Sequence, residues 1–108
     1  MKKIALIFLF SVSTSVYAQD AKTVPKSEWC SVVAELAGAI MSSRQSGVEL
    51  DKVLALSNKI GDGDSRLKDI ANQMAVEAYS ESGYISEKMQ KRSITEFKNK
   101  WQLDCIKS

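Results

Sequence analysis

The chain has 108 residues, of which 44% are hydrophobic and 26% are charged, a composition typical of a small globular protein. It contains no histidine, so the commonest general base and the commonest metal ligand are missing. This excludes hydrolases that use a histidine base and zinc sites that need imidazole. We therefore expect a non-enzymatic protein without cofactor or metal.

The first 18 residues are typical of a secretory signal peptide. Lys2 and Lys3 precede an unbroken apolar run over residues 4–10, and residues 16–18 (VYA) resemble a cleavage site. A transmembrane anchor needs about 20 apolar residues, so this run is too short to be one. We expect cleavage after Ala18, no stable membrane insertion afterwards, and a protein that works in a periplasm or outside the cell.

The charge balance changes when the signal peptide is removed. The whole chain has 15 lysines and arginines and 13 aspartates and glutamates. Because Lys2 and Lys3 are lost on cleavage and no acid is lost, the mature chain carries 13 charges of each sign. Bulk electrostatics then gives no support for nucleic-acid or anionic-membrane binding.

Cys30 and Cys105 are the two cysteines of the chain. Export places them in an oxidising compartment, so we expect a disulfide between them. Closing so long a loop restricts the unfolded chain by roughly 4–5 kcal/mol in the chain-entropy model. No C-x-x-C spacing supports a redox-active pair. An intermolecular bridge is the remaining alternative.

The first two helices are predicted over 27–45 and 49–60. Ser27 suits the N-cap of the first helix, and Gly47 suits the left-handed position after its end. Because only a few residues join these helices, we expect them to pack as an antiparallel hairpin. The apolar face of the second helix combines four residues: Leu50, Val53, Leu54 and Ile60.

Residues 61–64 contain two glycines and two aspartates, which suggests a calcium loop. However, Arg66 stands at the next ligand position and Gln73 at the closing position, where such a loop needs acids. We interpret the segment as a turn in which Asp64 or Ser65 caps the next helix.

The third helix is predicted over 64–81 and ends before Gly83. Its stripe consists mostly of small residues: Leu67, Ile70, Ala71, Met74, Ala75 and Ala78. The fourth helix is predicted from an N-cap at Ser86 to about Ile106. Its apolar side is formed by Met89, Ile94, Phe97, Trp101 and Cys105.

These four segments predict an all-α fold, a small antiparallel bundle closed by one disulfide. The helical domain covers 27–108 and follows a flexible polar lead over 19–26. An up-down-up-down arrangement brings both cysteines to the same end of the bundle. We expect Trp29 and Trp101 to cluster around the sulfurs as core residues, with ligand stacking as the alternative.

Charge is uneven between the last two helices. Residues 62–81 carry five acids against two bases, and residues 86–108 carry six bases against three acids. We expect the two helices to face each other, with a weak contribution from these charges. The alternative is that the basic last helix binds an acidic partner.

Two segments are candidate contacts for a partner protein. The first is the corner around Gly83, where Tyr79, Tyr84 and Ile85 are more apolar than a loop requires. The second is the Arg44-Gln45 pair at the end of the first helix. In the alternative reading the apolar corner caps the bundle end and Arg44 complements the helix dipole.

Several short motifs resemble a group of small exported bacterial and prophage-encoded proteins of unknown function. They span residues 30–105 and comprise Cys30, Ile40-Met41, Arg44-Gln45, Gly47-Val48, Ala78-Tyr79, Ile94, Glu96-Phe97, Asn99 and Cys105. The resemblance implies a disulfide-closed helical protein and no catalytic residues. The chain is also similar to periplasmic acid-stress chaperones, which are small, exported, helical, free of histidine and closed by one disulfide.

Two functional hypotheses follow. The first is a non-enzymatic module that binds another protein, as an inhibitor or exclusion factor. The alternative is a chaperone activated by acid, because carboxylates protonate near pH 4 and leave the cations unopposed. A hydrolase with paired carboxylates is disfavoured, since Glu77 and Glu81 lie on the polar side of their helix without an apolar pocket.

Overall fold

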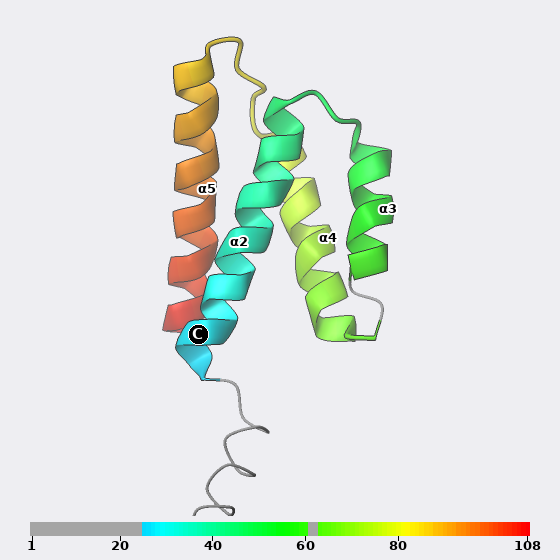
Figure 1. Ribbon diagram of the computed structural model, residues 1–108, viewed down its shortest axis with the longest axis vertical. Coiled ribbons are helices and arrows are strands. Elements are labelled where there is room, and N and C mark those ends of the chain that lie inside the picture. Colours follow the sequence, from blue (N-terminus) through cyan, green and yellow to red (C-terminus); the bar gives the residue numbers. More distant parts are fainter. Residues whose placement is uncertain (1–24, 61–62) are drawn as a thin grey trace, which may run out of the picture.

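The computed structural model describes residues 25–60 and 63–108. The predicted signal peptide over 1–18, almost all of the lead over 19–26, and Gly61 and Asp62 lie outside these ranges. The described part of the chain forms four helices and no strand: α2 (Lys26–Gln45), α3 (Leu50–Ile60), α4 (Ser65–Ser80) and α5 (Glu87–Lys107). They run alternately up and down (Figure 1), which confirms the small antiparallel all-α bundle.

Local capping sets most helix starts. The side chain of Asp64 accepts hydrogen bonds from the backbone N–H groups of Arg66 and Leu67 at 3.0 and 3.2 Å, as predicted for α4. Ser86 accepts one from Met89 at 3.1 Å and starts α5, again as predicted.

The predicted cap of the first helix is wrong. Ser27 lies inside α2, which begins at Lys26 and has Pro25 at its N-cap position. The carbonyl of Pro25 already accepts the N–H of Trp29 at 3.1 Å. Proline holds φ near its helical value, here −57°, so this helix starts without a side-chain cap.

Helix ends follow the predictions at one of two glycines. Gly47 adopts φ +85° directly after the C-cap of α2, as expected for a left-handed terminator. Gly83 is not a terminator of this kind, because α4 already ends when Glu81 turns to an extended conformation with ψ 159°.

The helices stand side by side in the order α5, α2, α4, α3 (Figure 1). Helix α2 packs against both α5 and α4, whereas α3 packs mainly against α4. Both predicted hairpins are therefore wrong: α4 lies between α2 and α3, and α2 lies between α4 and α5. The physical reason is that α2 buries residues along most of its length and can be covered on two sides.

Small side chains allow this close packing. The stripe of α4 is confirmed, since Ala71, Met74, Ala75 and Ala78 are all fully buried. On α2, Gly38 leaves room for the aliphatic stem of Lys98 on α5, which would lie 3.6 Å from an added Cβ.

In α3 the expected inward position of Ile60 is wrong. Ile60 is the last residue of the helix and is 53% exposed. Val53 and Ser57, one turn apart, are the buried residues of this helix.

Candidate functional site

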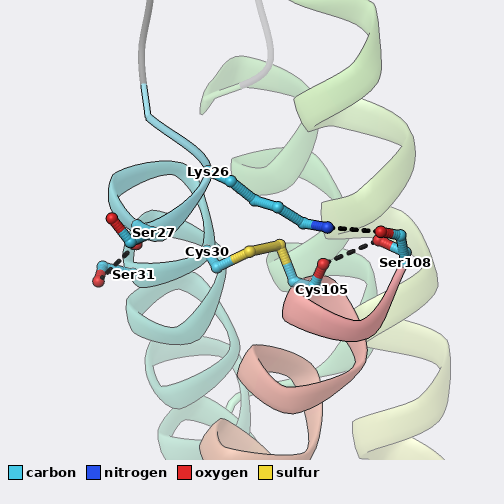
Figure 2. The surroundings of a disulfide bond; sticks show 6 residues. All are labelled: Lys26, Ser27, Cys30, Ser31, Cys105 and Ser108. Carbon is cyan, nitrogen blue, oxygen red and sulfur yellow. Dashed lines mark hydrogen bonds between the residues drawn. A yellow bond between two sulfur atoms is a disulfide. The ribbon is translucent and has the colours of Figure 1, made fainter.

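A disulfide between Cys30 and Cys105 joins the start of α2 to the end of α5 (Figure 2). Their Cα atoms lie 5.6 Å apart, within the normal range for this bond, which confirms the predicted intramolecular pairing. Nearby, the ammonium group of Lys26 donates a hydrogen bond to the carbonyl of Ser108. The first and last described turns of the chain are thus tied together twice.

Both tryptophans lie beside this disulfide. Trp29 and Trp101 line a hollow of about 220 Å³ together with Cys105 and other residues from α2, α4 and α5: Val33, Ile70, Asp104 and Ser108. We call it the aromatic hollow. The ring of Phe97 meets that of Trp101 edge to face, with centroids 6.3 Å apart. The guanidinium of Arg66 lies 4.1 Å from the ring centroid of Trp29.

At the opposite end, two side chains from the last turn of α2 hold the loop between α4 and α5. Arg44 donates from Nε and Nη2 to the carbonyl of Glu81 at 3.2 and 3.0 Å. Gln45 donates from Nε2 to the carbonyl of Ser82 at 2.9 Å, and its Oε1 accepts the N–H of Tyr84 at 2.9 Å. We call these contacts the loop clamp.

The structure brings together the two candidate segments, which are almost 40 residues apart in the sequence. Tyr79 is half-buried, its ring centroid lies 5.3 Å from Arg44, and its hydroxyl donates to the carbonyl of Val48. Burial raises the pKa of Tyr79, and the nearby Arg44 charge lowers it by less. Gln45 is only 8% exposed, so its side chain faces the loop and not solvent.

The two remaining candidates lie on the surface side of the clamp. Tyr84 is half-buried, and its carbonyl accepts a hydrogen bond from Gln90 at 2.6 Å. Ile85, the next residue, is fully exposed. The loop clamp therefore presents a bare aliphatic side chain on a backbone that is held from both sides.

A groove runs beside this loop between α4 and α5, which we call the α4/α5 groove. It exists because the two helices both pack against α2 and scarcely approach each other. Its volume is about 490 Å³, and it has an apolar floor with charged rims: Met41, Glu77, Glu81, Tyr84, Met89, Arg92, Ser93, Glu96, Phe97 and Lys100.

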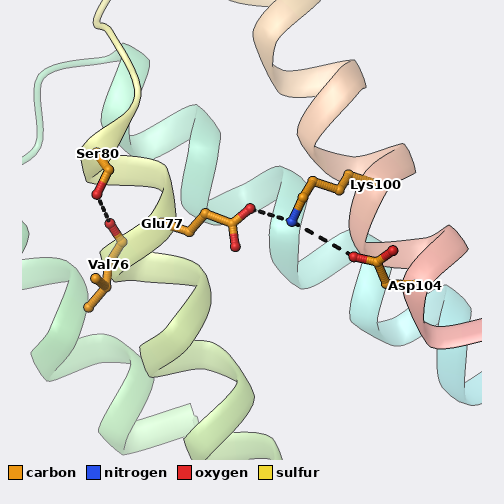
Figure 3. Close-up of polar contacts among 5 residues, drawn as sticks. All are labelled: Val76, Glu77, Ser80, Lys100 and Asp104. Atoms are coloured by element: carbon orange, nitrogen blue, oxygen red, sulfur yellow. Dashed lines mark hydrogen bonds and ion pairs between the residues drawn. The ribbon is translucent and has the colours of Figure 1, made fainter. Parts of the chain in front are cut away.

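Lys100 spans the gap between the two helices (Figure 3). Its ammonium group lies 2.5 Å from a carboxylate oxygen of Glu77 on α4 and 3.8 Å from one of Asp104 on α5. The hydrogen bond to Glu77 raises the pKa of Lys100 and outweighs the opposite effect of partial burial. Among the described residues this is the single ion pair between α4 and α5. The charge complementarity expected along these helices is thus limited to one point.

Sequence reasoning missed the groove. Met89 and Phe97 were expected on one apolar side of the last helix, but Phe97 is buried whereas Met89 is 36% exposed and lines the groove. Only the insertion of α2 between α4 and α5 separates their environments, and helical periodicity carries no signal of that insertion.

In the ranges that the structure covers, no group of three acidic, cysteine or histidine side chains could hold a metal ion. Within the same ranges, none of the helices is long and apolar enough to cross a membrane. No protein-family model, curated protein or solved structure matches the chain.

Proposed function

We propose that this chain is an exported, non-enzymatic protein that binds another protein through Ile85 and the α4/α5 groove. It would act as an inhibitor or exclusion factor of the kind exported by bacteria and encoded by prophages. The observation that carries the proposal is the full exposure of Ile85 on a clamped loop. A bare aliphatic group on a fixed backbone is a suitable interface anchor, because little conformational freedom is lost on binding.

The groove supports a helical partner segment. Its floor includes Met41 and Phe97, and its rims carry charges of both signs, including Glu81 and Arg92. An amphipathic helix with an apolar face and polar flanks matches such a surface. A helix laid there would cover the face of α2 that α4 and α5 leave open.

Sequence and disulfide together support export and the absence of catalysis. The apolar run of residues 4–10 and the basic start are typical of a signal peptide, and a disulfide suits an oxidising compartment. The chain has no histidine, and both cysteines are joined to each other, so the usual nucleophile and base pairs are missing.

Site-specific cross-linking tests this proposal. A photoreactive amino acid would replace Ile85 in one protein and Leu56 in a control, because Leu56 is 56% exposed on α3 at the far side of the molecule. In oxidised periplasmic extract we expect position 85 alone to capture a discrete partner. With that partner purified, Ile85→Asp should weaken binding by at least about tenfold, whereas Leu56→Asp should not.

The proposal fails if positions 85 and 56 capture the same proteins to the same extent. It also fails if Ile85→Asp binds the purified partner as tightly as the unchanged protein does. Circular dichroism of both variants establishes that they are folded before binding is compared.

The acid-stress chaperone is the second candidate, and the Glu77–Lys100 ion pair favours it. This pair spans the groove, and acid removes such a pair by protonating the carboxylate. The groove can then widen while the Cys30–Cys105 bond keeps α2 and α5 joined. Suppression of client aggregation at about pH 3, with none at pH 7, is the expected result. Equal inactivity at both pH values would rule the chaperone out.

A further inference from the structure

The aromatic hollow has the size of a single substituted ring. Its volume is about 220 Å³, whereas an apolar cavity of about 150 Å³ is enough to bind benzene. Trp29 and Trp101 provide aromatic walls, and Val33 and Ile70 provide aliphatic ones. These surfaces favour a planar apolar group over a flexible polar one.

One wall also contains an unused hydrogen-bond donor. The indole nitrogen of Trp101 is buried and has no acceptor among the residues described. Buried polar groups in folded proteins are nearly always hydrogen bonded, so an unpaired donor calls for an explanation. A bound group that brings an acceptor to this nitrogen would supply the missing bond.

Charges around the hollow narrow the ligand further. Asp104 lines the hollow, so a negatively charged ligand is disfavoured. Arg66 already covers Trp29 at 4.1 Å, and a cationic ligand would meet this like charge near the ring. A neutral ring avoids both penalties.

We infer that the aromatic hollow binds a small neutral aromatic ring that carries a hydrogen-bond acceptor, of the phenol type. This site lies at the disulfide end of the bundle, whereas Ile85 lies at the opposite end. The inference does not rest on the proposed function, and its test uses different residues.

Nuclear magnetic resonance of the ¹⁵N-labelled, oxidised protein purified after export provides the test. The chain has two tryptophans, so its two indole N–H signals both come from walls of the hollow. With p-cresol we expect both signals to shift saturably with a Kd of about 1 mM or below, and the Trp101 signal to move farther. Toluene, which has no acceptor, should bind roughly three- to tenfold more weakly.

Three variants locate the binding. Ile70→Phe fills the hollow and should weaken p-cresol binding by at least about tenfold. Val76→Phe is the matched control on the exposed face of the same helix and should leave binding unchanged. Trp101→Phe keeps a ring but removes the donor, so p-cresol should then bind no better than toluene, even if Ile70→Phe fails to fold.

A peptide with a single tyrosine distinguishes the two sources of such a ring. Tighter binding than p-cresol indicates a ring carried by a protein, and weaker binding indicates a free small molecule. The inference is overturned if p-cresol shifts neither indole signal at concentrations well above the expected Kd. It is equally overturned if p-cresol and toluene bind alike, or if folded Ile70→Phe binds like the unchanged protein.

Discussion

The α2–α5 pair and the α3–α4 pair are held together by different means. A disulfide fixes α2 to α5 at one end, and at the other end the Gln45 side chain of α2 holds the loop that leads into α5. Between α3 and α4 the described residues make one side-chain hydrogen bond, from Asn72 to Asn58 at 3.3 Å, and the rest is packing. The first pair is a covalently closed frame, and the second depends on a tight fit of small residues.

The largest effect is expected at the disulfide. Replacing both residues, as Cys30→Ala with Cys105→Ala, should lower the free energy of unfolding by about 4 kcal/mol, because the unfolded chain regains the freedom of a loop of 75 residues. Urea denaturation followed by circular dichroism measures the change. A loss below about 1 kcal/mol would show that the α2–α5 frame does not depend on its covalent bond.

The next effect is expected in the packed pair. Met74 is fully buried on α4, so Met74→Ala should cost about 3 kcal/mol through lost burial and the cavity left behind. Val76 on the same helix is 59% exposed, and Val76→Ala should stay within about 0.5 kcal/mol. Equal costs in urea denaturation would contradict the view that packing alone holds this pair.

The loop clamp is expected to contribute less. Gln45→Leu keeps an apolar stem but leaves the N–H of Tyr84 and the carbonyl of Ser82 without this partner, at a cost of about 1–3 kcal/mol. Hydrogen exchange of the Tyr84 amide should quicken more than that of amides in α3. Gln73→Leu, on an exposed part of α4, is the control, and unchanged exchange at Tyr84 would argue against the clamp.

The smallest effect is expected with pH. The pKa of Tyr79 is raised above 10.0 in the folded protein, so the unfolded chain loses this proton first. The contribution of Tyr79 is complete below about pH 10 and disappears as pH rises through its folded-state pKa. Lys100, whose pKa is also raised, loses its contribution in the alkaline range as well.

Urea midpoints measured across the alkaline range test this effect. Tyr79→Phe should remove the Tyr79 part of the alkaline loss, whereas Tyr84→Phe should leave the profile of the unchanged protein. An identical alkaline loss in Tyr79→Phe would show that Tyr79 ionisation does not contribute.

The sequence predicted local structure well and the arrangement of helices poorly. Asp64, Ser86 and Gly47 are caps whose effect is decided within a few residues, so helix limits were within about two residues of those observed. Which helices become neighbours depends on long-range fit, such as Gly38 accommodating Lys98, and no local pattern reveals it.

The same distinction applies to the candidate site. Arg44-Gln45 and the tyrosine corner were identified separately, each from its residue types. Their meeting depends on hydrogen bonds between residues 37 and 39 positions apart, which periodicity does not encode. The exposure of Ile85 follows from that meeting, so it became visible only in three dimensions.

The Cys30–Cys105 bond also changes what a protease can achieve. A cut within the loop between α4 and α5 would divide the backbone, yet the α5 fragment would stay attached to α2 through the two sulfurs. Reassociation of the fragments is then intramolecular and independent of dilution. Such a nicked molecule should migrate as one species until a reductant separates its parts.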